Sequence, residues 1–208
     1  MTKTLKKPAG LPSLAAGVVV ALLALTLTVH RADAAQDASA FIANLGAQGV
    51  QALAPGVSAL ESTRRLRQLL QEDFDIPGIG LFALGRYRSS TTPQEQQEFF
   101  RLYPDFTVQA FGARLKEYGG TSFQVTNRRS AGNETVVGSE IVRSDGRRVS
   151  LDWYLTDSTG QYRITDVTVG GLSMRIALRD QFVSWIENNR SSFGAFLTVL
   201  RQQVAQTR

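Results

Sequence analysis

Apolar and polar residues alternate strictly in one stretch of the chain, residues 149–156, which read VSLDWYLT. The apolar residues fall on every second position, which is the period of a β-strand with one buried face. Turn-forming residues follow at 157–160, and a second β-rich run occupies 162–169. The pattern predicts a β-hairpin, and a pair of glycines at 170–171 ends it.

Two further β-rich runs precede this hairpin, at 121–127 and 134–143, and an Asp-Gly pair at 145–146 provides a tight-turn signal ahead of it. An apolar run at 172–178 can form another strand or turn the chain back sharply. Strands that follow one another through such short turns form an antiparallel sheet. We therefore expect a curved antiparallel sheet of four to five strands over about residues 121–180.

Apolar residues in the first half of the chain recur at intervals of three and four, which is the helical period. Residues 37–53 and 58–74 form two such segments, and a short buried helix after them should end near Gly85. A last amphipathic helix occupies about residues 190–206. Helices that mostly precede the sheet predict the α+β class, with a helical part over about residues 37–120 packed against the sheet.

Three of these helices begin with capping signals. Ser58 is followed three residues later by Glu61, and Thr92 is followed by a proline and then by Glu95. Both spacings are typical of a capping box, in which the two side chains bond to each other's backbone amides. Ser192 is expected to cap the last helix.

The helix that follows Thr92 is unusually rich in aromatic residues, with Phe99, Phe100, Tyr103, Phe106 and Phe111. Pro104 lies inside it and is expected to kink or split the helix. Core packing can account for these rings, but so many on one helix also leave room for the wall of an apolar cavity. We expect them to face the sheet across that cavity, opposite Leu151, Trp153 and Leu155.

The chain opens with three lysines in its first seven residues, followed by an apolar run at 14–29 and the sequence Ala-Asp-Ala at 32–34. This order is typical of a secretory signal peptide over residues 1–34, cleaved near Ala34. The apolar run is short for a membrane helix, which needs about 20 residues. A retained anchor is the alternative. We expect export to the periplasm and a single mature domain over 35–208.

The amino-acid composition excludes several classes of function. The formal net charge is +5, but the first 34 residues hold three of these charges, so the mature chain is no more basic than +2 and shows no sign of nucleic-acid binding. The chain has no cysteine, and its single histidine, His30, lies in the predicted signal peptide. Disulfides, a lipoprotein anchor, Ser-His-Asp and Cys-His sites and the usual zinc sites are therefore excluded, and we expect neither a metal nor a cofactor.

Four stretches carry a family likeness: FDIPGIGLFALGRYR at 74–88, TPQEQQEFFRLY at 92–103, LKEYGG at 115–120 and GQYRITDVTVGGLSMRIALRDQF at 160–182. Together and in this order they resemble the periplasmic MlaC family, also called toluene-tolerance Ttg2D proteins. The likeness covers most of the mature chain. Three features depart from the family pattern: Arg88 in place of an aromatic residue, Pro104 inside its helix, and Ala177-Leu178 in place of an Asn-Tyr pair.

The resemblance implies a lipid carrier rather than an enzyme. Such a carrier shelters the acyl chains of a diacyl phospholipid between the sheet and the helices, and it serves lipid transport that maintains outer-membrane asymmetry. The implied partners are an outer-membrane complex of a lipoprotein and a porin, and an inner-membrane ABC transporter with an MCE-domain subunit, which the carrier serves as its substrate-binding component. We expect a monomer. Because of the departures above, a hopanoid or another apolar lipid remains an alternative cargo.

The candidate lipid contacts are apolar or aromatic residues of the two expected walls: Leu84, Tyr87, Phe99, Phe100, Tyr103, Phe106, Phe111, Leu151, Trp153, Leu155, Val167, Val169, Leu172 and Met174. Arg86, Arg88 and Arg179 are candidates for head-group binding or docking, because a guanidinium can form two parallel hydrogen bonds to a phosphate. Salt bridges to Asp75, Asp152 or Asp166 are the alternative role for these arginines.

Two other classes of function remain open from the residues alone. A small-pocket enzyme could use Asp166 as a general base, with Tyr87 or Tyr154 as a hydrogen-bond donor. An aspartate before a glycine turn more often accepts hydrogen bonds from backbone amides. A module that binds only a partner protein is the third class.

Overall fold

The structure is a computed structural model that describes residues 30–117, 120–143, 145–157, 160–188 and 192–205. Most of the predicted signal peptide lies outside the described residues, so its cleavage near Ala34 stays a prediction. The chain divides into two compact units, residues 1–37 and 38–208. The fold described below is that of the second unit.

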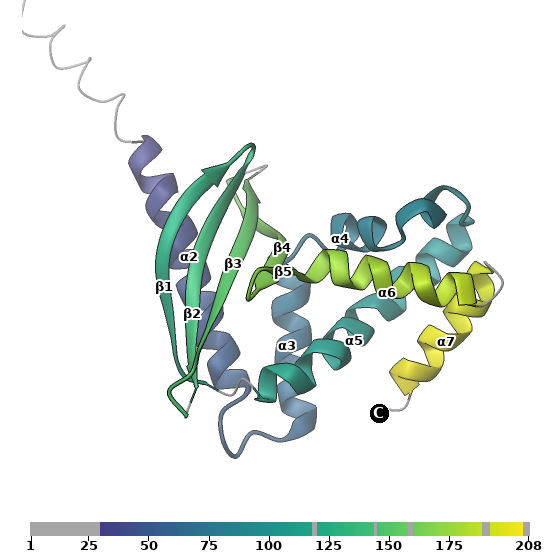
Figure 1. The fold of residues 1–208 in the computed structure, drawn as a ribbon, viewed down its shortest axis with the longest axis horizontal. Coiled ribbons are helices and arrows are strands. Elements are labelled where there is room, and N and C mark those ends of the chain that lie inside the picture. Colours follow the sequence, from purple (N-terminus) through teal and green to yellow (C-terminus); the bar gives the residue numbers. More distant parts are fainter. Residues whose placement is uncertain (1–29, 118–119, 144, 158–159, 189–191, 206–208) are drawn as a thin grey trace, which may run out of the picture. The chain divides into compact units, whose positions relative to one another are not determined.

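One antiparallel sheet holds five strands in the order in which they follow along the chain (Figure 1). The strands are β1 (Gly120–Ala131), β2 (Glu134–Arg143), β3 (Arg148–Asp157), β4 (Tyr162–Val169) and β5 (Leu172–Ser173). Trp153 of β3 stands opposite Val137 of β2 and Val167 of β4, so these three side chains share one face of the sheet. The predicted sheet and the α+β class are confirmed.

The helices fall before and after the sheet. They are α2 (His30–Ala52), α3 (Ala59–Asp73), α4 (Ile76–Ala83), the 3-10 helix η1 (Gly85–Ser89), α5 (Pro93–Glu117), α6 (Met174–Asn188) and α7 (Phe193–Ala205). Gly85, the first residue of η1, has a φ of 55°, and this left-handed conformation stops α4 from continuing. Helix α6 is not in the sequence-based prediction, which placed a strand or a reversal at 172–178.

All three predicted caps form, but only one of the two predicted capping boxes is complete. The Ser58 hydroxyl accepts a hydrogen bond from the Glu61 amide at 3.2 Å, and the Ser192 hydroxyl accepts one from the third residue of α7, also at 3.2 Å. Thr92 and Glu95 form a complete capping box, with bonds of 3.2 and 2.8 Å in the two directions. The Glu61 carboxylate does not complete its box, because it binds two arginines of α3 instead.

Pro104 does not divide its helix. Helix α5 continues from Pro93 to Glu117 with Pro104 inside it, so the prediction of a split is wrong. Proline cannot donate a backbone hydrogen bond, but the turn around it is packed: Pro104 is buried, and the hydroxyl of Thr107 donates to the carbonyl of Tyr103 at 2.8 Å. Tertiary packing thus outweighs the local cost of the proline.

Two clusters of buried side chains make up the core. The helical cluster joins α4, η1, α5, α6 and α7, and it holds Ile79, Ala83, Leu84, Tyr87, Phe99, Leu102, Tyr103, Phe106, Leu178, Phe182, Ile186, Phe193, Phe196, Leu197, Leu200 and Val204. The sheet cluster joins α2, α3 and the sheet, and it holds Ala38, Ile42, Leu45, Leu69, Val137, Leu155 and Ile164. Phe74 packs against both clusters and connects them.

Candidate functional site

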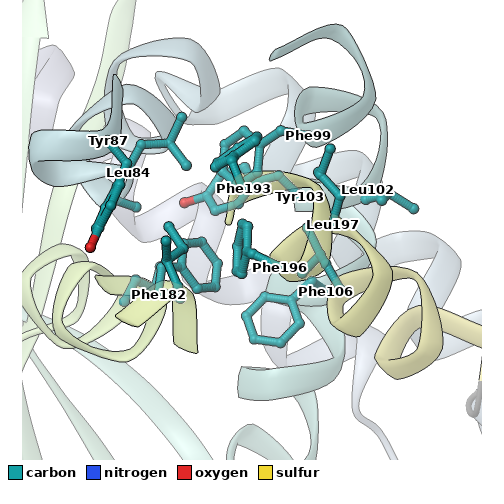
Figure 2. Close-up of a cluster of buried hydrophobic side chains, with 14 of the residues drawn as sticks. Leu84, Tyr87, Phe99, Leu102, Tyr103, Phe106, Phe182, Phe193, Phe196 and Leu197 are labelled. Atoms are coloured by element: carbon teal, nitrogen blue, oxygen red, sulfur yellow. The ribbon is translucent and has the colours of Figure 1, made fainter. Parts of the chain in front are cut away.

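Three aromatic residues of α5, Phe99, Tyr103 and Phe106, lie in the helical cluster, where they pack against rings from α6 and α7 (Figure 2). Phe99 is fully buried, and its ring centroid lies 5.2 Å from that of Tyr103, 5.9 Å from Phe182 and 6.3 Å from Phe196. These spacings are those of directly packed rings. Phe182 in turn lies 5.3 Å from Phe106. The innermost rings of α5 therefore form a close-packed core.

The apolar face of the sheet is covered by α2 and α3. Leu155 and Ile164 are fully buried against residues of these helices, among them Ile42. The ring of Phe123 lies so close to Gly46 of α2 that a Cβ atom added to this glycine would come within 2.1 Å of it. Only glycine at this position allows the helix to approach the sheet so closely.

Trp153 lies on this same face and carries its one polar atom to a partner. The indole nitrogen donates a hydrogen bond of 2.8 Å to the hydroxyl of Ser139, which is itself buried. The Trp153 ring also lies 6.2 Å from that of Phe123, edge to face. This bond fixes the orientation of the largest ring on the sheet and keeps a buried hydroxyl satisfied.

The arrangement differs from the expected pair of opposed walls. The rings of α5 belong to the helical cluster, whereas Trp153 and Leu155 belong to or pack against the sheet cluster. The helix that was expected to face the sheet packs instead against α3 and α7. A pattern of apolar residues shows that a helix face is buried, but it does not show which element buries it.

Exposure divides the candidate lipid contacts into three groups. Leu84, Tyr87, Phe99, Tyr103, Phe106, Leu151 and Leu155 are buried. Phe100, Phe111, Trp153, Val167, Val169 and Met174 are half-buried, and Leu172 is exposed. Only the half-buried and exposed residues offer surface to a ligand without a rearrangement of the core.

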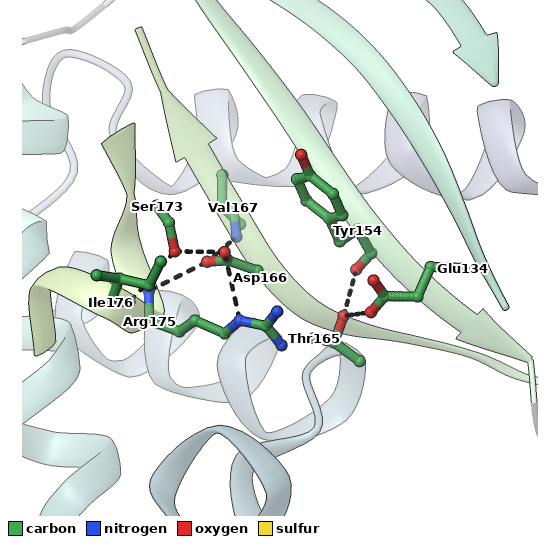
Figure 3. Close-up of polar contacts among 8 residues, drawn as sticks. All are labelled: Glu134, Tyr154, Thr165, Asp166, Val167, Ser173, Arg175 and Ile176. Atoms are coloured by element: carbon green, nitrogen blue, oxygen red, sulfur yellow. Dashed lines mark hydrogen bonds and ion pairs between the residues drawn. The ribbon is translucent and has the colours of Figure 1, made fainter. Parts of the chain in front are cut away.

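Asp166 is enclosed by donors that come from its own strand, from β5 and from the start of α6 (Figure 3). It is 5 % exposed, and it accepts hydrogen bonds from the Val167 amide at 2.8 Å, the Arg175 amide at 3.1 Å and the Ser173 hydroxyl at 2.5 Å. The guanidinium of Arg175 lies 3.5 Å away. Both carboxylate oxygens of Asp166 thus accept hydrogen bonds that fix β5 and the first turn of α6. This geometry supports a structural role for Asp166, because a general base needs a lone pair directed at a substrate.

The three candidate arginines lie on η1 and α6. Arg86 pairs with Glu187 of α6 and donates to the Tyr87 hydroxyl at 3.2 Å, and Arg179 pairs with its neighbour Asp180 at 3.2 Å. These ion pairs are exposed, so they contribute little to stability. The aspartates proposed as alternative partners bind other groups: Asp152 binds Arg129, Asp166 binds Arg175, and Asp75 caps α4 through the Gly78 amide.

Burial fixes the protonation state of one ionisable side chain in the helical cluster. Burial raises the pKa of the Tyr103 phenol far above its usual range, so this tyrosine stays protonated. No group of three or more histidine, cysteine, aspartate or glutamate side chains among the described residues could hold a metal ion. Within the same residues, every helix is too short or too polar to cross a membrane.

The sequence-based prediction missed two aromatic residues at these sites. Phe123 packs beside Trp153, and Phe182 is central to the helical cluster. Phe123 alternates with Val125 in a run already predicted as a strand, and Phe182 lies four residues after Leu178 and four before Ile186. Both spacings were available as signals.

Comparisons with known proteins agree with one another. A family model described as MlaC protein matches residues 54–202. The intermembrane phospholipid transport system binding protein MlaC of Haemophilus influenzae is 21 % identical over 151 residues, which cover 68 % of this chain and 69 % of that protein. The toluene tolerance protein ttg2D of Pseudomonas putida is 24 % identical over 126 residues, which cover 60 % of this chain and 59 % of that protein.

One solved structure shares the fold. The phospholipid-binding protein from Ralstonia solanacearum, determined in complex with a phospholipid, superposes with a TM-score of 0.66 at 20 % identity. The match covers 81 % of this chain and 97 % of that one. At this identity the likeness establishes the common fold.

Proposed function

The chain belongs to the MlaC family, and on this basis we propose that it is a periplasmic carrier that binds a diacyl phospholipid and moves it between membranes. One observation supports the proposal most directly: the fold is shared, over nearly the whole of the other chain, with a protein that was solved with a phospholipid bound. The names of the two relatives, a phospholipid transport binding protein and a toluene tolerance protein, point to the same class.

Transfer energetics explain why such a carrier must enclose the acyl chains. Each methylene group exposed to water costs about 0.8 kcal/mol, so a lipid with roughly 30 of them faces on the order of 25 kcal/mol outside a bilayer. Hydrogen bonds to the head group are too weak to offset this cost, since each contributes only about 1 kcal/mol net. The apolar residues of the carrier must therefore surround the acyl chains as the bilayer interior does, but bind them weakly enough for the lipid to leave.

The half-buried residues are our candidates for contact with the chains. Trp153, Val167 and Val169 lie on the apolar face of the sheet, and Phe100 and Phe111 lie at the edge of the helical cluster. Each keeps apolar surface that a ligand can cover. In this proposal the fully buried rings, such as Phe99, support the site from behind and do not line it.

The proposal also includes the partners that the family likeness implies. An outer-membrane complex of a lipoprotein and a porin and an inner-membrane ABC transporter with an MCE-domain subunit would exchange lipid with this protein, which would act between them in maintaining lipid asymmetry. The absence of cysteine and the apolar segment near the N-terminus suit export to the periplasm.

Native mass spectrometry of the protein purified from cells tests the proposal. We expect a complex with one phospholipid, which collisional activation releases. A complex with a hopanoid would instead support the alternative cargo, and protein that is always empty, even after incubation with phospholipid vesicles, would refute the carrier function.

A matched pair of substitutions tests where the lipid lies. Val167→Gln places an amide on the apolar face of β4, and Thr168→Gln places the same group on the opposite face one residue later. We expect about tenfold lower lipid occupancy for the first variant and no change for the second, because the amide must be desolvated only at the first position. Equal occupancy in both variants would exclude this face of the sheet as the site.

A further inference from the structure

Two exposed apolar residues lie four positions apart where the sheet passes into α6. Three large hydrophobic residues are exposed in the part of the chain that the structure describes, and two of them are Leu172 at 57 % and Ile176 at 40 %. The third, Leu60 at 82 %, is on α3. Leu172 belongs to β5 and Ile176 to the first turn of α6, four residues later. Exposed apolar residues that are grouped in this way, unlike isolated ones, indicate a contact surface.

The backbone holds this corner in a defined position and leaves it open to solvent. Gly170 and Gly171, with φ of 58° and 85°, form the tight turn before β5, and a Cβ atom on either would have no neighbour within 4 Å. The Ser173 hydroxyl accepts a hydrogen bond from the Ile176 amide at 3.2 Å and donates one to the buried Asp166. The corner is therefore anchored from inside the fold and unobstructed outside.

Two arginines lie before and after Ile176 on the first turns of α6. Arg175 and Arg179 lie one turn apart on α6, and both guanidinium groups rest on the ring of Phe82, with Cζ at 4.9 and 5.2 Å from its centroid. Such cation–π contacts hold the groups in place without using their hydrogen-bond donors. The Nε of Arg175 faces Asp166, and its side chain remains about one third exposed.

The ion pair of Arg179 does not prevent it from binding another anion. Its partner Asp180 is mostly exposed, and exposed pairs between neighbouring residues contribute little stability. A phosphate can therefore replace this carboxylate at small cost, and it accepts the same forked pair of hydrogen bonds.

We propose that Leu172, Arg175, Ile176 and Arg179 form a docking face for the surface of a phospholipid bilayer. A bilayer surface presents phosphates above an apolar layer, and this corner presents two guanidinium groups from the first turns of α6 together with two apolar side chains that remain exposed. The face goes beyond the carriage of a lipid, since it concerns how the protein meets a membrane and not what it holds inside.

Flotation with vesicles tests the face. The protein is purified from the soluble fraction of cells that express the full chain, and its intact mass is measured so that an uncleaved apolar N-terminus cannot explain binding. With vesicles of phosphatidylethanolamine and phosphatidylglycerol, we expect the protein to float at low salt. Leu172→Ser and Ile176→Ser should each weaken binding about tenfold, because each removes the apolar part of the contact. Arg179→Gln should weaken it and reduce its dependence on salt.

Leu60→Ser is the matched control, because it removes an even more exposed leucine elsewhere and should not change flotation. A second readout uses fluorescence: Leu172→Trp should shift its emission to the blue on adding vesicles, whereas Leu60→Trp should not. Wild-type protein that does not float, or a Leu60 variant that loses as much binding as the Leu172 variant, would overturn the proposal. Native mass spectrometry of the Ile176→Ser variant separates the two proposals, because Ile176 is not among the candidate lipid contacts and this variant should keep its bound phospholipid.

Discussion

Replacing Phe99 by alanine tests whether the aromatic helix is a core or the wall of a lipid site. Phe99 is fully buried and lies within 6.3 Å, centroid to centroid, of five other rings. A buried Phe→Ala substitution costs about 3–5 kcal/mol through lost transfer energy and the cavity that remains. Domains of this size have total stabilities of about 5–15 kcal/mol, so the loss is a large fraction. We expect the full loss in protein from which lipid has been removed.

Urea unfolding of the delipidated protein, followed by tryptophan fluorescence, measures this loss. The denaturation midpoint should fall at an unchanged m-value, since the exposed surface of the unfolded state is the same. Phe100→Ala is the control one residue away, because Phe100 is half-buried, and it should cost less than half as much. If Phe99→Ala costs under about 1 kcal/mol without lipid and several with lipid bound, the ring lines the lipid site and our assignment is wrong.

Three further substitutions or titrations test particular contacts. Asp166→Asn should lower the free energy of unfolding by about 3 kcal/mol, because it leaves the partly buried guanidinium of Arg175 without its charge partner. Asp152→Asn, at an exposed ion pair, should cost under about 1 kcal/mol. Equal losses for the two variants in thermal unfolding would contradict this. Gly46→Ala should destabilise the protein, since its Cβ would meet an aromatic ring at 2.1 Å, and Gly49→Ala, with nothing within 4 Å, should stabilise it by about 0.5–1 kcal/mol. The reverse order would show that α2 does not pack on the sheet as described. Hydrogen bonds from two arginines lower the pKa of Glu61 to about 2, so the stability from these pairs is present above the usual pKa of 4.5 and is lost as the pH falls towards 2. An NMR titration midpoint near 4.5 would show that the pairs do not form in solution.

Local signals in the sequence predicted local structure well. The capping residues Ser58, Thr92 and Ser192 begin their helices as expected, and Gly85 adopts the left-handed conformation that ends α4. Each of these features depends on a few neighbouring residues, whose chemistry is read directly from the chain. The strands were found for the same reason, because alternation is a local pattern.

Features that depend on distant contacts were not predictable in the same way. Helix α6 was missed because its first residues belong to an apolar run, 172–178, that reads as a strand, although Leu178, Phe182 and Ile186 recur at the helical interval of four. The pairing of α5 with α7, and of the sheet with α2, also depends on which apolar faces fit each other. Hydrophobic burial is not directional, so a one-dimensional pattern does not contain this choice.

Burial separates the residues that hold the fold from those that can hold a ligand. A fully buried ring such as Phe99 has already gained its transfer free energy from its neighbours, so a lipid could gain from it only by displacing them. A half-buried residue such as Val167 still has apolar surface to cover, and each 100 Å² covered contributes about 2.5 kcal/mol. A carrier must bind its cargo without unfolding when the cargo leaves, and this requires that the two roles fall on different residues. Two results would establish this division. A substitution at Val167 should reduce lipid binding without lowering the free energy of unfolding, and a substitution at Phe99 should lower the free energy of unfolding with or without lipid.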